Sequence, residues 1–281
     1  MAATDVSRKS DLRRQACSVN KLAHAVTARQ HRRAYRSLTT SHEITMPVHV
    51  VPQNELRAAE RMAGWSLITA AVGFMAVFGY LAARFDYPRV LDGSAADVLP
   101  RLLALGDAGR AVWVVYALLP LLLIPAAVGA HAVLRDSAPT TMRLALVSGI
   151  IAAISMLLGL ARWPSVHWEL ARAWATASPD ARQAIDAVFR GLNSYLGTYI
   201  GEFLGELSLN GFFVFSGIAL LRAGRRWAGY GGLAAGVIGL VAALRNTTTV
   251  VAPIAALDNS VLPLWLIVLG VVLLRGRRLS S

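Results

Sequence analysis

Two glutamates stand in an otherwise apolar stretch of the chain. Glu202 and Glu206 lie within residues 195–221, which are enough to cross a bilayer as one helix. A carboxylate near the bilayer centre costs about 2.5–3.5 kcal/mol on insertion scales, so these side chains are not expected to face lipid. Acids kept at that cost indicate either an ion, proton or polar-ligand site inside a helix bundle, or an ion pair that fixes the register of the helices.

The two acids belong to a pattern with a spacing of four. Residues four apart share one face of an α-helix. One such face, the polar face, carries Ser194, Thr198, Glu202, Glu206 and Asn210. The neighbouring glycine face carries Gly197, Gly201 and Gly205. Small residues at this spacing let a second helix approach closely. The pattern predicts a ligand- or ion-binding surface beside a helix-packing surface.

Two arginines are candidate partners for these acids. Arg162 closes the third apolar segment and Arg245 closes the fifth, and both are expected at the same end of the bundle as Glu202. At about 1.5 Å per residue, Glu206 is expected about 3 Å from the middle of its segment. Two interpretations stay open. The arginines are partners or anion contacts in a binding or transport protein for a small polar ligand or a proton, or they close an internal ion-pair lock in a structural or regulatory membrane protein.

Other chemistry lacks the residues it needs. The sequence contains no GxSxG, HExxH or Walker motif, so no catalytic residue is assigned and an enzyme is the less favoured class. The single Cys17 excludes an internal disulfide and a thiolate zinc site within one chain. His131 and His167 are expected on opposite sides of a core about 30 Å thick, so they cannot share a metal or haem. We expect no metal and no cofactor, and a surface position for His167; a single-histidine metal site with Glu202 is the alternative.

The composition indicates a membrane protein. Hydrophobic residues make up 56% of the 281 residues and charged residues 16%, well below the roughly 25% of a soluble domain. The net charge of +12 does not indicate a nucleic-acid partner, because 11 of the 28 Lys and Arg residues precede residue 63. A basic segment beside an anionic bilayer surface accounts for this charge better.

Six apolar segments predict the architecture. They are residues 63–83, 111–134, 144–162, 195–221, 227–244 and 257–274. Pro120, Pro125 and Pro263 fall inside segments and are expected to kink these helices without ending them. The fold class is therefore all-α, a polytopic transmembrane helix bundle of about six spans. Amphipathic helices are expected in its outer connections, one starting at Ser178-Pro179-Asp180 and another within residues 165–177.

The distribution of basic residues predicts the orientation. The two ends of the chain and the connections on their side carry 19 Lys and Arg residues, and the other side carries 9. Cytoplasmic connections are enriched in Lys and Arg, so both termini are expected in the cytoplasm.

The chain is expected to divide into a basic, disordered segment, residues 1–54, and a transmembrane bundle, residues 55–281. A translation start at Met46 would remove most of the basic segment and no apolar span. The segment is also rich in Arg and Ser and poor in acids, as organelle transit peptides are. Both alternatives stay open.

Three motifs carry a family resemblance. The fourth span ends in Ile218-Ala-Leu-Leu-Arg222, the fifth opens with Arg226-Trp-Ala-Gly-Tyr-Gly-Gly232, and the last contains Leu262-Pro263-Leu264-Trp265. With the six-span plan, they resemble a family of small bacterial integral membrane proteins known only as a domain of unknown function. The resemblance covers roughly residues 55–275. It implies a bacterial cytoplasmic (inner) membrane, with the lipid bilayer as partner, and it implies no activity. The N-terminal segment exceeds the usual size of that family.

Overall fold

The computed structural model of the protein describes residues 52–276, except for the side chain of Asp92. The chain divides into residues 1–51 and residues 52–281, and nearly all of the predicted basic segment, with Met46, lies outside the described residues. Every regular element of the described part is a helix. Six helical runs are long and apolar enough to cross a membrane, which confirms the predicted all-α bundle of a multi-pass membrane protein.

Each run consists of one or more helical elements. The runs are α2 (Gln53–Phe85); α4 (Gly106–Leu118), η2 (Leu119–Leu122) and α5 (Leu123–Leu134); α6 (Pro139–Ala161), η3 (Trp163–His167) and α7 (Trp168–Thr176); α8 (Pro179–Leu192), η4 (Asn193–Leu204) and α9 (Gly205–Arg222); α10 (Arg226–Ala242) and η5 (Ala243–Asn246); and η6 (Thr249–Val251) and α11 (Ala252–Leu274). Pro120 lies in η2 and Pro263 inside α11. The helical path continues through both, as predicted.

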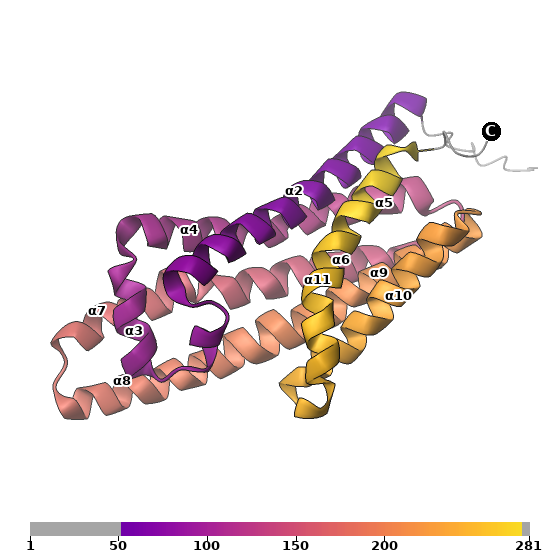
Figure 1. The fold of residues 1–281 in the computed structure, drawn as a ribbon. Helices are drawn as coiled ribbons and strands as arrows, with labels where there is room; N and C mark the ends of the chain where they lie inside the picture. Colours follow the sequence, from indigo (N-terminus) through magenta and orange to yellow (C-terminus); the bar gives the residue numbers. More distant parts are fainter. Residues whose placement is uncertain (1–51, 277–281) are drawn as a thin grey trace, which may run out of the picture. The chain divides into compact units, whose positions relative to one another are not determined.

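The spans pack in chain order and form a closed ring. α2 contacts α5, α5 contacts α6, α6 contacts α9, α9 contacts α10, α10 contacts α11, and α11 returns to α2 (Figure 1). One hydrophobic core takes buried side chains from all six spans, among them Leu67, Leu123, Ala152, Phe212, Ala235 and Leu266. The inside of the ring is therefore packed with side chains.

Glycines set the closest approaches between spans. A Cβ on Gly64 of α2 would lie 2.7 Å from the carbonyl oxygen of Gly270 in α11. A Cβ on Gly217 of α9 would lie 3.0 Å from the carbonyl oxygen of Gly229 in α10. Because side chains do not fit at these contacts, the backbones pack directly against each other.

Three short helices cover one end of the spans. This cap consists of α3 (Ala95–Ala104), α7 and α8, which contact one another beyond the end of α2 (Figure 1). The short η1 (Arg89–Asp92) connects α2 to it. Ser178 Oγ accepts a hydrogen bond from the backbone N–H of Ala181 at 3.3 Å, and Pro179 opens α8, so the predicted helix start is confirmed. The first and last described helices meet at the opposite end.

Candidate functional site

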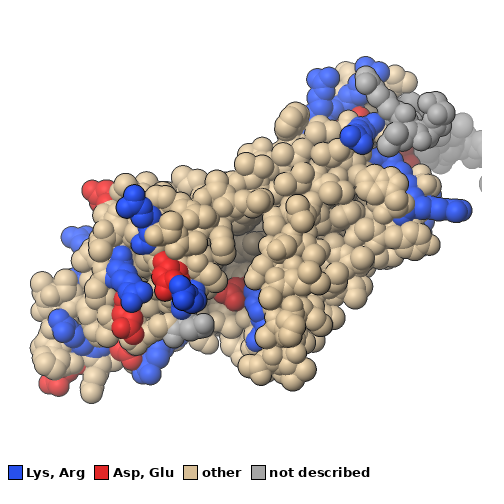
Figure 2. Space-filling view, in the orientation of Figure 1, with Lys and Arg blue, Asp and Glu red and all other residues tan. Residues whose placement is uncertain are grey.

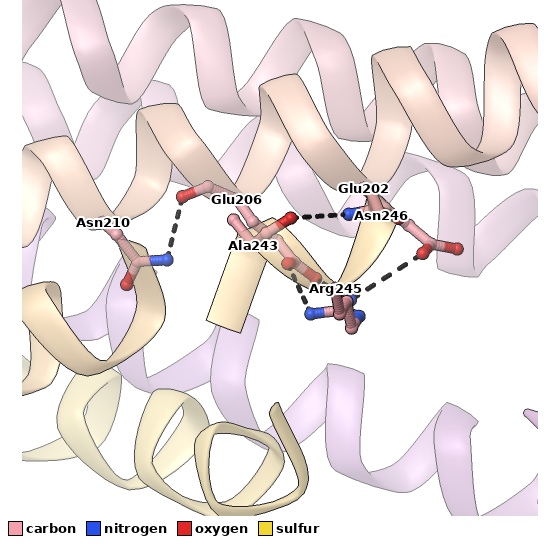
Figure 3. A network of polar contacts seen from close by, with 6 residues as sticks. All are labelled: Glu202, Glu206, Asn210, Ala243, Arg245 and Asn246. Atoms are coloured by element: carbon pink, nitrogen blue, oxygen red, sulfur yellow. Dashed lines mark hydrogen bonds and ion pairs between the residues drawn. The ribbon is translucent and has the colours of Figure 1, made fainter. Parts of the chain in front are cut away.

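Arg245 and Glu206 form the central contact of the candidate site. Arg245 of η5 donates from Nη1 to Glu206 Oε2 at 2.7 Å and from Nη2 to Glu206 Oε1 at 2.5 Å (Figure 3). Two parallel bonds between a guanidinium and a carboxylate combine charge with defined geometry and are strong. The pair ties the start of α9 to the end of the fifth span.

Glu202 reaches the same guanidinium. Its Oε2 lies 3.7 Å from Nη2 of Arg245. Figure 3 shows the carboxylates of Glu202 and Glu206 approaching Arg245 from successive turns of the fourth span. The guanidinium of Arg245 therefore pairs with two carboxylates.

Asn210 lies one turn beyond Glu206 on α9. Its Nδ2 donates to the carbonyl oxygen of Glu206 at 2.9 Å, and its side chain is fully buried. A Cβ on Gly239 of α10 would lie 2.1 Å from Asn210 Oδ1. The absence of a side chain at Gly239 thus provides the space that Asn210 fills.

The first half of the polar face is wound differently from the prediction. Residues Asn193–Leu204 form a π-helix, in which hydrogen bonds run from residue i to i+5. More residues enter each turn than in an α-helix, so positions four apart no longer stand directly above one another. Thr198 lies half-buried in this segment. Glu206 and Asn210, in the α-helical α9, keep the predicted spacing.

Arg162 occupies a closed position within electrostatic range of Glu202. Its Nε and Nη2 donate to Asn193 Oδ1 at 3.3 Å and 3.1 Å, and its Nη1 donates to the carbonyl oxygen of Gly159. The guanidinium carbon lies 5.1 Å from the ring centroid of Trp163. Only 5% of Arg162 is exposed. These hydrogen bonds go to neutral oxygens, in contrast to the bidentate carboxylate contact of Arg245.

The three residues of the glycine face meet different parts of the third span. A Cβ on Gly197 would lie 2.5 Å from Arg162 Nη2, and one on Gly201 would lie 2.7 Å from the Cα of Gly159. A Cβ on Gly205 would lie 2.8 Å from Met156 Cγ. The glycine face thus lies against α6 and against Arg162, which directly follows α6.

Asp258 of α11 completes the cluster. The sequence shows it as an acid at the edge of the last apolar segment, and no role follows from that position alone. Only 3% of the residue is exposed, and its Oδ1 makes no hydrogen bond within the described residues. It lies within electrostatic range of Arg245 and Glu206. Its approach to them depends on the ring, which places α11 beside α10.

The cluster is accessible from outside the protein. The side chains of Glu202, Arg245 and Glu206 are 35%, 28% and 16% exposed. Figure 2 shows a hollow in the uncharged belt between the two charged ends of the described part, with acidic and basic atoms inside it. Charged groups are therefore open to the outside within an otherwise apolar part of this face.

Glu206 lies in the first turn of α9, the half of the fourth run that leads away from the cap. It precedes Arg222, where α9 ends, by 16 residues, or about 24 Å of helix. The continuous helical run from Pro179 to Arg222 exceeds the apolar core of a bilayer, about 30 Å thick, because α8 extends into the cap.

His167 is fully buried, so the expectation of a surface histidine is wrong. Its ring lies 4.8 Å from the centroid of Trp163 and 4.7 Å from that of Phe189, and neither ring nitrogen has a hydrogen-bond partner within the described residues. Burial follows from the π-helix η3, which turns this side chain into the aromatic cluster between the spans and the cap. Between residues 52 and 276, no three His, Cys, Asp or Glu side chains are placed to hold a metal ion.

Tyr87 adds a phenol near the cluster, in the connection after α2. Burial, followed by the negative charge of Glu202, raises the pKa of Tyr87 to about 12. Its ring lies edge-on to Trp113 at 5.9 Å and to Tyr116 at 6.2 Å. Tyr87 therefore remains a neutral phenol at physiological pH.

Comparison with known proteins identifies a family without an assigned activity. The model of a domain of unknown function, DUF4386, matches residues 62–270, and this match includes parts of all six spans. No curated protein and no solved structure matches the chain. The match confirms the resemblance drawn from the fourth, fifth and sixth spans. The chain belongs to the DUF4386 family.

Proposed function

We propose that this protein binds a proton or a small cation at Glu202 and Glu206, and that it acts as a membrane binding or transport protein. The observation that carries the proposal is the accessible cluster in which one guanidinium serves two carboxylates. Charged groups that only held helices together would be best placed in a closed site such as that of Arg162. The exposed fraction of the Arg245 side chain, 28%, instead supports access by a solute.

A proton or cation that binds the site competes with Arg245 for the carboxylates, and this competition is the mechanism that we propose. A proton or cation that reaches Glu206 neutralises the partner of Arg245 and weakens their two hydrogen bonds. The contact between η5 and α9 then loosens, so occupancy of the site changes how the fourth and fifth spans are held. In this proposal Asn210 and Thr198 flank the acids, and Arg162 adds a fixed positive charge near them.

A second candidate is a structural or regulatory membrane protein in which the same residues form an internal lock. The bidentate geometry between Arg245 and Glu206 favours it. In a lock, removal of one partner leaves the other charge without compensation, which costs about 3–5 kcal/mol when the pair is fully buried.

Thermal unfolding of purified protein in detergent separates the two candidates. We would measure Tm for the wild type, Glu202→Gln and Glu206→Gln from about pH 5 to about pH 9, where perturbed carboxyl groups titrate. Methylammonium chloride and sodium chloride, compared at equal ionic strength, serve as the two cation probes. Asp136→Asn, at an exposed acid outside the site, is the control variant.

The binding function predicts a wild-type Tm that changes with pH and rises with either cation. Both responses should be reduced in Glu202→Gln and Glu206→Gln and kept in the control. Neutralising a strained functional site often leaves stability unchanged or raised. A much lower Tm for Glu206→Gln at every pH, with no cation effect on the wild type, would support the lock and reject the binding site.

We also propose that both chain ends face the cytoplasm, in the cell membrane of a bacterium. The described end opposite the cap carries the acids Glu55, Glu60 and Asp136 and eight arginines: Arg57, Arg61, Arg135, Arg143, Arg222, Arg225, Arg226 and Arg275. This excess follows the rule for cytoplasmic sides.

Labelling with a membrane-impermeant thiol reagent in intact cells tests this orientation. In a Cys17→Ser background, we expect Asp180→Cys in the cap to be labelled and Asp136→Cys to be protected. The reverse pattern would contradict the proposed orientation.

A further inference from the structure

We infer that Asp258 carries an exchangeable proton and is the inner member of the site at Arg245. This inference rests on the proposed function and names a binding residue on a different span. It extends the site from the fourth and fifth spans to the sixth.

The surroundings of Asp258 support a bound proton. The residue is 3% exposed, and Oδ1 receives no hydrogen bond within residues 52–276. A buried carboxylate anion without full hydrogen bonding is costly, whereas a protonated carboxyl group removes the charge and gains a donor. The charged groups that act on Asp258 are Arg245, from η5, and Glu206, from α9. Arg245 already makes two hydrogen bonds to Glu206, so its charge is largely committed there.

A second buried oxygen near Glu206 also lacks a donor. Asn210 is fully buried, and its Oδ1 has no hydrogen-bond partner within the described residues, although its Nδ2 is bonded to Glu206. Buried polar atoms in proteins are nearly always paired. Two acceptors without donors, one on α9 and one on α11, indicate that the interior beside the pair is suited to protons or cations.

The arrangement allows Arg245 to exchange its partner. When a proton binds Glu206, Arg245 loses the carboxylate to which it donates two hydrogen bonds and keeps only the longer contact with Glu202, at 3.7 Å. Asp258 then releases its proton to solvent and becomes the second counter-ion of Arg245, beside Glu202. One proton enters at Glu206 and one leaves Asp258, so the net charge of these three residues is unchanged. The exchange moves the ion pair of Arg245 from α9 to α11, and proton binding would thereby move a contact of η5 from the fourth span to the sixth.

Infrared spectroscopy of the full-length protein in lipid vesicles tests this inference. A protonated carboxyl group has a C=O stretching band separate from that of a carboxylate, and the band shifts in D2O when the proton exchanges. We expect this band in the wild type at neutral pH, its loss in Asp258→Asn, and its persistence in Asp136→Asn. Asp258→Glu should shift the band, which assigns it even if Asp258→Asn does not fold.

The wild-type spectrum alone can overturn the inference. If it contains no protonated carboxyl band at neutral pH, Asp258 does not carry a proton. A band that is unchanged in both Asp258 variants would do the same. These outcomes differ from failure of the proposed function. If the rise in Tm with cations depends on Glu202 and Glu206 but the band is absent, the proposed cation site is supported and the inferred role of Asp258 is rejected. If the band is assigned to Asp258 but no cation raises Tm, the proposed cation binding is rejected and the inferred proton on Asp258 is supported.

Discussion

The guanidinium of Arg245 holds the carboxylate of Glu206 across 39 positions of the sequence. The contact lies where the fifth span ends and where the fourth changes from π- to α-helical winding. π-helical segments are rare in proteins, and those that occur are often found at functional sites. The pair therefore joins two irregular points of the bundle, and a change in its charge would act on both spans.

Arg245→Gln should destabilise the protein by about 1–3 kcal/mol, less than for a fully closed pair because water reaches the site. Arg245→Lys should recover part of this loss, because lysine keeps the charge but not the two parallel hydrogen bonds. The measurement is the free energy of unfolding in detergent. Arg190→Gln, which breaks the pair of the exposed Arg190 with the half-buried Asp186, should cost no more than about 1 kcal/mol. Equal losses for Arg245→Gln and Arg190→Gln would contradict the central role of Arg245.

Gly201→Ala should destabilise the protein by about 1–3 kcal/mol, because the new Cβ would stand 2.7 Å from the backbone of Gly159. Gly191→Ala, in α8, is the matched control, since a Cβ there meets nothing within 4 Å. It should leave stability unchanged or raise it by about 0.5–1 kcal/mol, because alanine favours the helix. Thermal unfolding of both variants measures the difference, and a Gly201→Ala protein as stable as the control would show that the spans separate easily.

Gly239→Ala and Asn210→Ala should not be additive. Alone, Gly239→Ala places a Cβ within 2.1 Å of Asn210 Oδ1 and displaces the amide from Glu206. In the Asn210→Ala background this clash is absent, so the same change should cost less by about 0.5–3 kcal/mol. A double-mutant cycle on unfolding free energies gives the coupling. A coupling of zero would mean that the two residues do not contact each other in the folded protein.

Ser178→Ala should loosen the start of α8. The change removes the hydrogen bond from Ala181 N–H to the serine hydroxyl and should cost about 1 kcal/mol. Hydrogen exchange of the first turn of α8 should become faster, with little change in the six spans. Ser178→Asp keeps an N-cap acceptor and should restore the slow exchange; fast exchange in this variant would show that α8 begins without the cap.

Tyr87 should titrate about two pH units above an ordinary tyrosine, because its pKa is raised to about 12. Its proton is bound more tightly in the folded protein than in the unfolded chain. The stabilisation is therefore fully present below about pH 10, the unfolded pKa, and is lost as the pH rises toward 12. The difference in ultraviolet absorbance between the wild type and Tyr87→Phe isolates this titration. A difference curve centred near pH 10 would place the phenol in water.

Local properties of the sequence determined most of the architecture. Long uncharged segments indicated six spans, because a helix that crosses a bilayer must be apolar over about 20 residues. The start of α8 followed from three consecutive residues, Ser178, Pro179 and Asp180, because capping is a local interaction. The cost of an acid in an apolar segment similarly identified Glu202 and Glu206 as residues that need a partner.

Tertiary structure decided which partners meet. The sequence offered Arg162 and Arg245 equally, and the fold places the guanidinium of Arg245 against both acids while Arg162 binds the carbonyl of Gly159 and the amide of Asn193. The approach of Asp258, the burial of His167 and the π-helical winding of η4 also depend on the ring and the cap. Hydrophobicity and capping act over a few neighbouring residues. Ion pairs and ring packing join side chains from distant segments, so only the folded bundle determines them.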